Sequence, residues 1–133
     1  MVRKIVKKTG LNNFLKKQLL LPTKIYVKEI LNLNKYNLLH ASANITGGGI
    51  IENIPRSIPN GYTANIDLSK IKVLKIFKWL KSKNISDFEM LRTFNCGIGF
   101  CLITDKKKEK RIRKFFDKKY QPYKIGYINK SSK

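Results

Sequence analysis

Three consecutive glycines, Gly47–Gly49, follow an apolar segment that ends at Ile45. Glycine permits positive φ and leaves backbone N–H groups uncovered, and the first turn of a helix adds partial positive charge. With Thr46 as helix N-cap, this turn is a candidate cradle for a phosphate or another anion. The run is neither a GxGxxG nor a Walker A pattern, so a tight turn between closely packed backbones is the alternative interpretation.

Arginine is the second source of candidate chemistry, because most of the basic residues are lysines. A planar guanidinium can bind a phosphate or carboxylate through two parallel hydrogen bonds. Arg56 follows the glycine turn closely, and Arg92 opens a polar segment that continues with Thr93 and Asn95. A structural ion pair is the alternative role for Arg56.

Neither a metal centre nor a thiol nucleophile is expected. The chain has two cysteines and one histidine, His40, which is too few ligands for a zinc site. Cys96 and Cys101 are five positions apart in an expected strand, and this odd spacing places them on opposite faces as reduced thiols. No histidine or aspartate adjoins Cys96 in the sequence, so catalysis by this thiol is not expected.

Composition indicates one folded domain. The 133 residues are 42% hydrophobic, which is enough for a core, and no apolar run approaches a membrane span. The N-terminus has no apolar stretch typical of a secretory signal, so a cytoplasmic protein is expected. The net charge of +21 is compatible with nucleic-acid binding. However, the lysines are scattered and accompany many Asn and Ile residues with A/T-rich codons, which favours compositional drift.

Hydrophobic periodicity predicts four strands, at 38–45, 62–68, 98–104 and 122–129. Helices are expected at 1–8, 13–20, 24–33, 50–54, 70–82, 87–91 and 105–119. The expected helix caps are Gly10, Asn12 or Asn13, Thr23, Ser69, and Ser86 with Glu89. The predicted fold is an α+β layered domain over 1–130, with a mixed, mainly four-stranded sheet covered by helices, followed by a frayed tail at 131–133.

Several segments, taken together and in one register, resemble the phosphoribosylformylglycinamidine cyclo-ligases, also called aminoimidazole ribonucleotide synthetases. The segments are Leu-Pro-Thr-Lys-Ile-Tyr-Val-Lys at 21–28, Ile-Thr-Gly-Gly-Gly at 45–49, Glu-Asn-Ile-Pro-Arg at 52–56 and Arg-Thr-Phe-Asn-Cys-Gly-Ile-Gly at 92–99. The resemblance covers nearly the whole chain but only most of the C-terminal half of the family enzyme. It implies the cyclo-ligase C-terminal-domain fold.

The resemblance also implies a reaction and its site. The family uses ATP to activate an amide oxygen of formylglycinamidine ribonucleotide, and an amidine nitrogen then closes the imidazole ring in purine biosynthesis. It implies catalytic roles for Asn44, Glu52 and Asn95, with Glu52 positioning a substrate amine or Mg²⁺. The residues implied in substrate or phosphate binding are Thr46, Gly47, Gly48, Gly49, Asn53, Arg56, Arg92 and Thr93.

Two departures from the family pattern stand out. Asn44 occupies a position where the family usually has histidine, and an amide does not titrate near neutral pH. His40, on the same expected strand face, either replaces the acid–base function of that histidine or is a structural histidine.

The helix expected at 1–8 starts without a cap, and its segment 2–6 resembles a helix of the family enzyme. We therefore expect an N-terminal half, which supplies most of the ATP and Mg²⁺ binding and much of a homodimer interface, to be missing here.

The resemblance leaves three alternatives to a working cyclo-ligase half. One is a basic nucleic-acid-binding module, one is a related ATP-using enzyme, and one is a non-catalytic remnant. The motif at 92–97 disfavours the related enzyme. Because one wall of a cleft cannot align two phosphate-bearing reactants, the chain alone is expected not to turn over substrate.

Overall fold

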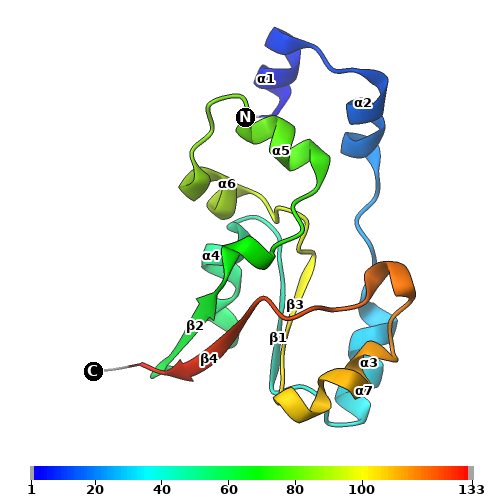
Figure 1. The fold of residues 1–133 in the computed structure, drawn as a ribbon, viewed down its shortest axis with the longest axis vertical. Coiled ribbons are helices and arrows are strands. Elements are labelled where there is room, and N and C mark those ends of the chain that lie inside the picture. The colour runs from blue at the N-terminus through cyan, green and yellow to red at the C-terminus, as the bar shows by residue number, and fades with distance from the viewer. Residues whose placement is uncertain (1, 132–133) are drawn as a thin grey trace.

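The computed structural model describes residues 2–131 (Figure 1). In this part of the chain, the α-helices are α1 Val2–Thr9, α2 Asn13–Leu20, α3 Val27–Lys35, α4 Gly49–Asn53, α5 Lys75–Lys81, α6 Asp87–Thr93 and α7 Glu109–Arg113. The strands are β1 Ala41–Asn44, β2 Tyr62–Ile66, β3 Phe100–Ile103 and β4 Gly126–Lys130. Short 3₁₀ turns occur at Pro55–Ser57, Leu68–Lys70, Lys106–Lys108 and Lys118–Tyr120. The α+β class and the four expected strands are confirmed.

The strands pair differently from the prediction. β1 pairs antiparallel with β3, so that Ala41 lies opposite Ile103 and Asn44 opposite Phe100. β2 pairs antiparallel with β4, and no strand in residues 2–131 joins the two ladders. The expected single mixed sheet of four strands is therefore wrong in its pairing: there are two sheets of two strands. Alternation of apolar residues indicates which face of a strand is buried, but it does not select the neighbouring strand.

Three apolar clusters hold these elements together. The central cluster joins both sheets to α4 and contains Ala43, Ile45, Ile50, Ile54, Ile71, Ile98 and Cys101. A second packs α3 against α7 through Leu33, Leu38, Ile112 and Phe116. A third packs α1, α5 and α6 around Leu80, Met90 and Cys96. Figure 1 shows the resulting arrangement, with α1, α5 and α6 at one end and α3 and α7 at the other.

Three of the expected helix caps are confirmed. The side chain of Asn12 accepts a hydrogen bond from the Leu15 N–H at 2.8 Å, and Ser86 accepts one from the Glu89 N–H at 3.2 Å. Gly10, at φ +66°, ends α1 with its N–H on the Val6 carbonyl. Such side-chain and glycine caps satisfy backbone groups that a helix end leaves unpaired.

The expected caps at Thr23 and Ser69 are wrong. Helix α3 begins only at Val27, after Tyr26, which makes no side-chain cap bond. Ser69 lies inside the 3₁₀ turn Leu68–Lys70, which Asp67 caps by accepting from the Ser69 N–H at 3.1 Å. Helix α5 begins only after Leu74, which makes no side-chain cap bond.

The expected helix 105–119 is also shorter than predicted. It breaks into α7 and the two 3₁₀ turns that flank it. Lysines and arginines recur at helical spacing along this segment, and repulsion between like charges destabilises a continuous helix. Glu109 offsets this locally, since its carboxylate accepts from Arg113 at 2.7 Å. At the C-terminus, the backbone N–H of Ser131 donates to the Gly61 carbonyl, and residues 132–133 of the expected tail lie outside the described part.

Helix α4 packs directly against α6 at Gly49. A Cβ added there would overlap the Leu91 carbonyl and lie 2.9 Å from the Phe94 carbonyl oxygen. Gly49 also has a φ of +55°, a value that L residues rarely adopt. By contrast, a Cβ at Gly47 would meet no atom within 4 Å.

We expect Gly49→Ala to lower the free energy of unfolding by about 2 kcal/mol or more, from the positive φ and the forced separation of α4 from α6. Gly47→Ala is the matched control and should change it by less than about 0.5 kcal/mol. Urea denaturation followed by circular dichroism measures both. Equal effects of the two substitutions would contradict the close contact at Gly49.

Candidate functional site

The glycine turn leaves the end of β1 and enters α4. The Ile45 N–H donates to the Gly99 carbonyl at 3.0 Å, so the turn starts beside the first residues of β3. Gly48, at φ +90°, is the N-cap of α4 and makes no side-chain hydrogen bond to the helix. The expected Thr46 cap is wrong, because the Gly49 N–H bonds to the Thr46 backbone carbonyl rather than to its hydroxyl. Thr46 and Gly47 are exposed.

Asn53 fixes the shape of this turn. Its side-chain amide donates to the carbonyl of Gly49 at 2.7 Å and to that of Gly47 at 3.1 Å. The amide therefore points back into the turn and bonds two of its carbonyls. Asn53 therefore contributes to the site by holding Gly47–Gly49 in this conformation.

Glu52 lies over the glycine turn and between two arginines. Its carboxylate is so close to Gly48 that a Cβ there would lie 2.6 Å from Oε2. Oε2 accepts from Arg56 at 3.2 Å, and Oε1 accepts from the Nε of Arg92 at 3.4 Å. The structure thus brings together Gly48, Glu52, Arg56 and Arg92, which we call the glutamate–arginine cluster. Its side chains are exposed by 37% for Glu52, 69% for Arg56 and 57% for Arg92, so each ion pair is weak.

Thr93 and Asn95 use their side chains locally. The Thr93 hydroxyl donates to Glu89 at 2.7 Å, and the Asn95 carbonyl oxygen accepts from the Gly97 N–H at 3.0 Å. The latter bond closes a turn in which Cys96 and Gly97 have positive φ. Within residues 2–131, neither side chain bonds to the glutamate–arginine cluster. Of the polar segment at 92–95, the structure therefore brings only Arg92 to Glu52.

Asn44 and His40 lie at opposite ends of β1. Asn44 is exposed at the end that leads into the glycine turn. His40 lies four residues earlier, about 13 Å away along an extended strand, and its Nε2 contacts Asp105 Oδ1 at 2.9 Å. The hydrogen bond with His40, together with Lys108, holds the pKa of Asp105 below its usual range. His40 is therefore paired with Asp105, at the end of β1 away from the glycine turn.

Both thiols are buried and unreactive. Cys96 lies in the turn before β3, with φ +51°, so the expectation that it belongs to a strand is wrong. Burial raises the pKa of Cys96 and raises that of Cys101 to about 12. The reactive thiolate is then a minor species at neutral pH.

Among residues 2–131 there is no group of three potential His, Cys, Asp or Glu metal ligands, and no helix is long and apolar enough to cross a membrane.

Tyr26 is a site neighbour that periodicity alone did not single out. Its hydroxyl lies against Gly99, so that a side chain at position 99 would require Tyr26 to shift, and its ring packs on Phe100 with centroids 5.4 Å apart. Burial raises the pKa of Tyr26. Next to it, Lys24 and Glu29 form a 2.7 Å ion pair with both side chains largely covered. These contacts anchor the segment before α3 to the start of β3, next to the strand end that carries Asn44.

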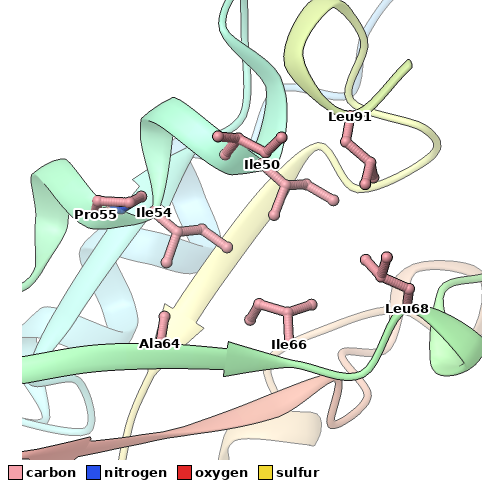
Figure 2. A pocket seen from close by; sticks show the side chains of 8 residues that line it. Ile50, Ile54, Pro55, Ala64, Ile66, Leu68 and Leu91 are labelled. Atoms are coloured by element: carbon pink, nitrogen blue, oxygen red, sulfur yellow. The ribbon is translucent and has the colours of Figure 1, made fainter. Parts of the chain in front are cut away.

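An apolar hollow of about 200 Å³ lies between α4 and β2. Figure 2 shows Ile50 of α4 and Ile54, which directly follows this helix, facing Ala64 and Ile66 of β2, with Leu68 and Leu91 at one side. An aliphatic lining offers no partner for a charged ligand. The charged groups of the glutamate–arginine cluster lie outside this hollow.

The fold and this edge define a small α+β domain whose polar residues gather around a glycine turn. The chain belongs to the family described as AIR synthase related protein, C-terminal domain, whose model matches residues 1–133.

Curated relatives agree with this assignment. The chain is 41% identical over 140 aligned residues to a phosphoribosylformylglycinamidine cyclo-ligase of Staphylococcus aureus (strain MSSA476), covering 98% of this chain and 41% of that protein. It is 48% identical over 104 residues to the protein of the same name from Geotalea daltonii, covering 77% of this chain and 30% of that protein. The chain thus spans about two fifths of the S. aureus relative. The nucleic-acid-binding alternative is not favoured by these matches.

We expect Asn53→Asp to open the glycine turn, because a carboxylate cannot donate to the carbonyls of Gly47 and Gly49. The free energy of unfolding should fall by about 1–2 kcal/mol. Amide hydrogen exchange should accelerate at residues 47–49. Asn60→Asp, an equal change of charge at an exposed turn residue, is the control and should leave both measurements near wild type. Unchanged exchange in Asn53→Asp would refute the locking role of this amide.

Proposed function

We propose that this chain is the C-terminal part of a phosphoribosylformylglycinamidine cyclo-ligase. In this reaction ATP transfers its terminal phosphoryl group to an amide oxygen of formylglycinamidine ribonucleotide. An amidine nitrogen then attacks the activated carbon, the C–O bond breaks, and phosphate leaves together with ADP. The observation that carries the proposal is the 41% identity to the S. aureus cyclo-ligase over 98% of this chain. The convergence of Arg56 and Arg92 at the glycine turn supports it.

The proposed roles follow from the chemistry of each group. Arg56 and Arg92 bind the phosphate ester of the ribonucleotide, with the backbone of Gly47–Gly49 beside it. Asn44 and Asn95 hydrogen-bond the reacting amide and amidine, and Glu52 holds a substrate amine. Thr46, Asn53 and Thr93 complete the substrate side, Asn53 by shaping the turn and the two threonines through their hydroxyl groups.

The asparagines and threonines proposed here hold and orient the substrate, since neither residue type transfers protons at neutral pH. The rate would come from positioning and charge stabilisation. ATP binds mostly to an N-terminal half of the enzyme, and Mg²⁺ there would neutralise the developing charge on the phosphates.

Exposed apolar surface on this chain supports the proposal that a large partner, such as the N-terminal half, binds it. The segment 20–31 carries five aliphatic side chains that are 61–84% exposed: Leu20, Leu21, Ile25, Val27 and Leu31. In addition, each strand among residues 2–131 pairs with only one other strand and keeps an open edge. Exposed apolar runs and open strand edges are features that proteins usually cover. We infer that an N-terminal half, in cis or in trans, covers them, and that the complete enzyme is a cytoplasmic homodimer.

We expect no ATP-dependent ring closure by the purified chain alone, and turnover after addition of the N-terminal half of a cyclo-ligase relative. Gly48→Val should abolish the restored activity, because its Cβ would collide with Glu52. Gly10→Val is the control: it has a comparable positive φ, at the end of α1, with no atom within 4 Å. Turnover by the chain alone would disprove its dependence on a partner. A folded chain that is never activated would identify a non-catalytic remnant.

We also expect the isolated chain to self-associate through the exposed segment 20–31. Replacing Leu20, Leu21 and Ile25 by serine should shift sedimentation velocity profiles toward the monomer, because it removes apolar surface that association buries. Serine at Leu68, Leu74 and Phe88, which are 49–62% exposed elsewhere on the chain, is the matched control. If the control triple variant shifts the sedimentation profile toward the monomer equally, self-association does not depend on segment 20–31 in particular.

A further inference from the structure

The glutamate–arginine cluster combines three elements around one carboxylate. Glu52 belongs to α4, Arg56 to the 3₁₀ turn that follows, and Arg92 to α6. The two arginines contact different oxygens of Glu52, at 3.2 and 3.4 Å. Arg92 is 40 residues away in sequence and reaches Glu52 because α6 packs against α4. The cluster is therefore a product of the tertiary fold and not of helical spacing alone.

The position of the carboxylate is as informative as its partners. Glu52 Oε2 lies within 2.6 Å of the place a Cβ would occupy on Gly48. It thus covers the backbone of the turn on the side where the two guanidinium groups point. Carboxylates and phosphates use the same arginine donors, and each guanidinium can serve only a limited number of oxygens. An incoming anion and the Glu52 carboxylate would compete for the same space and the same donors.

We propose that Glu52 is an internal competitor that closes the anion site until a phosphate ester displaces it from Arg56 and Arg92. The ligand class, a phosphomonoester, rests on the proposed function. In the free chain the carboxylate stands in for the phosphate and keeps the two arginines ordered. Binding exchanges these two ion pairs for contacts with phosphate and releases Glu52 toward the rest of the substrate.

Weak ion pairs suit this exchange. Because Glu52 and both arginines are substantially exposed, each pair contributes little to stability and is easily broken. A chain whose binding-competent form is only partly populated binds with an apparent affinity reduced by that fraction. Removing the competing charge while keeping the arginines should therefore tighten phosphate binding, whereas a residue that holds the ligand would weaken binding when it is replaced.

The test compares Glu52→Gln with Glu109→Gln. Both substitutions remove one carboxylate from an i,i+4 pair with arginine, and the two glutamates are 37% and 39% exposed. The two substitutions therefore raise the net charge equally, but only Glu52 lies against the glycine turn, whereas Glu109 lies in α7. Binding of inorganic phosphate and of ribose 5-phosphate is followed by NMR titration of the amides of residues 47–49, at fixed ionic strength.

Glu52→Gln should bind both probes about three- to tenfold more tightly than wild type, the range expected from freeing one or two exposed ion pairs. Glu109→Gln should bind within about twofold of wild type, since general charge has little effect at constant salt. Adding Arg92→Gln to Glu52→Gln should cancel the gain.

Equal or weaker binding by Glu52→Gln relative to Glu109→Gln would overturn the proposal, as would the absence of phosphate-dependent shifts in both variants. These results are separate from the complementation assay. Restored turnover without a Glu52→Gln gain would reject internal competition and leave the cyclo-ligase function standing. A Glu52→Gln gain without restored turnover would support the competition at an anion site in a chain that has lost its reaction.

Discussion

The backbone contact between Gly49 and α6 is the constraint on which the polar edge depends. Any side chain at this position would collide with the Leu91 carbonyl, so the two helices approach each other only through a glycine. Their approach places Arg92 beside Glu52 across 40 residues of sequence. It also fixes the entry to α4, where Asn53 binds the turn carbonyls from the other side. Widening this contact would separate Arg92 from Glu52 and loosen the glycine turn at once.

The chain has far fewer acidic than basic residues, so each carboxylate has many cations available to pair with. With 29 basic and 8 acidic residues, most cations have no acidic neighbour to pair with. Most of the acidic side chains are in ion pairs, and within residues 2–131 only Glu52 is shared between two arginines. The lysines are spread over the surface, and several lie over aromatic rings, such as Lys24 over Tyr120 at 4.4 Å.

The two small sheets share one core and leave much of their surroundings open. The central cluster draws residues from β1, β3 and α4 and is flanked by Ala64 and Ile66 of β2. Two-stranded sheets are marginal by themselves, so the helices and this shared core supply most of their stability. The exposed aliphatic run at 20–31 and the open strand edges lie outside that core. Their exposure fits a domain that spans about two fifths of its S. aureus relative.

The sequence by itself determined the local features. Alternating apolar residues located all four strands, and side-chain chemistry identified the caps at Asn12 and Ser86, because these signals act over a few residues. The family resemblance likewise came from contiguous motifs. Tertiary structure alone decided how the strands pair, why Gly49 must be glycine, and that Glu52 meets Arg92, while Thr93 and Asn95 bond elsewhere. These outcomes depend on contacts between residues far apart in the chain, and hydrophobic periodicity carries no information on which distant elements will pack together.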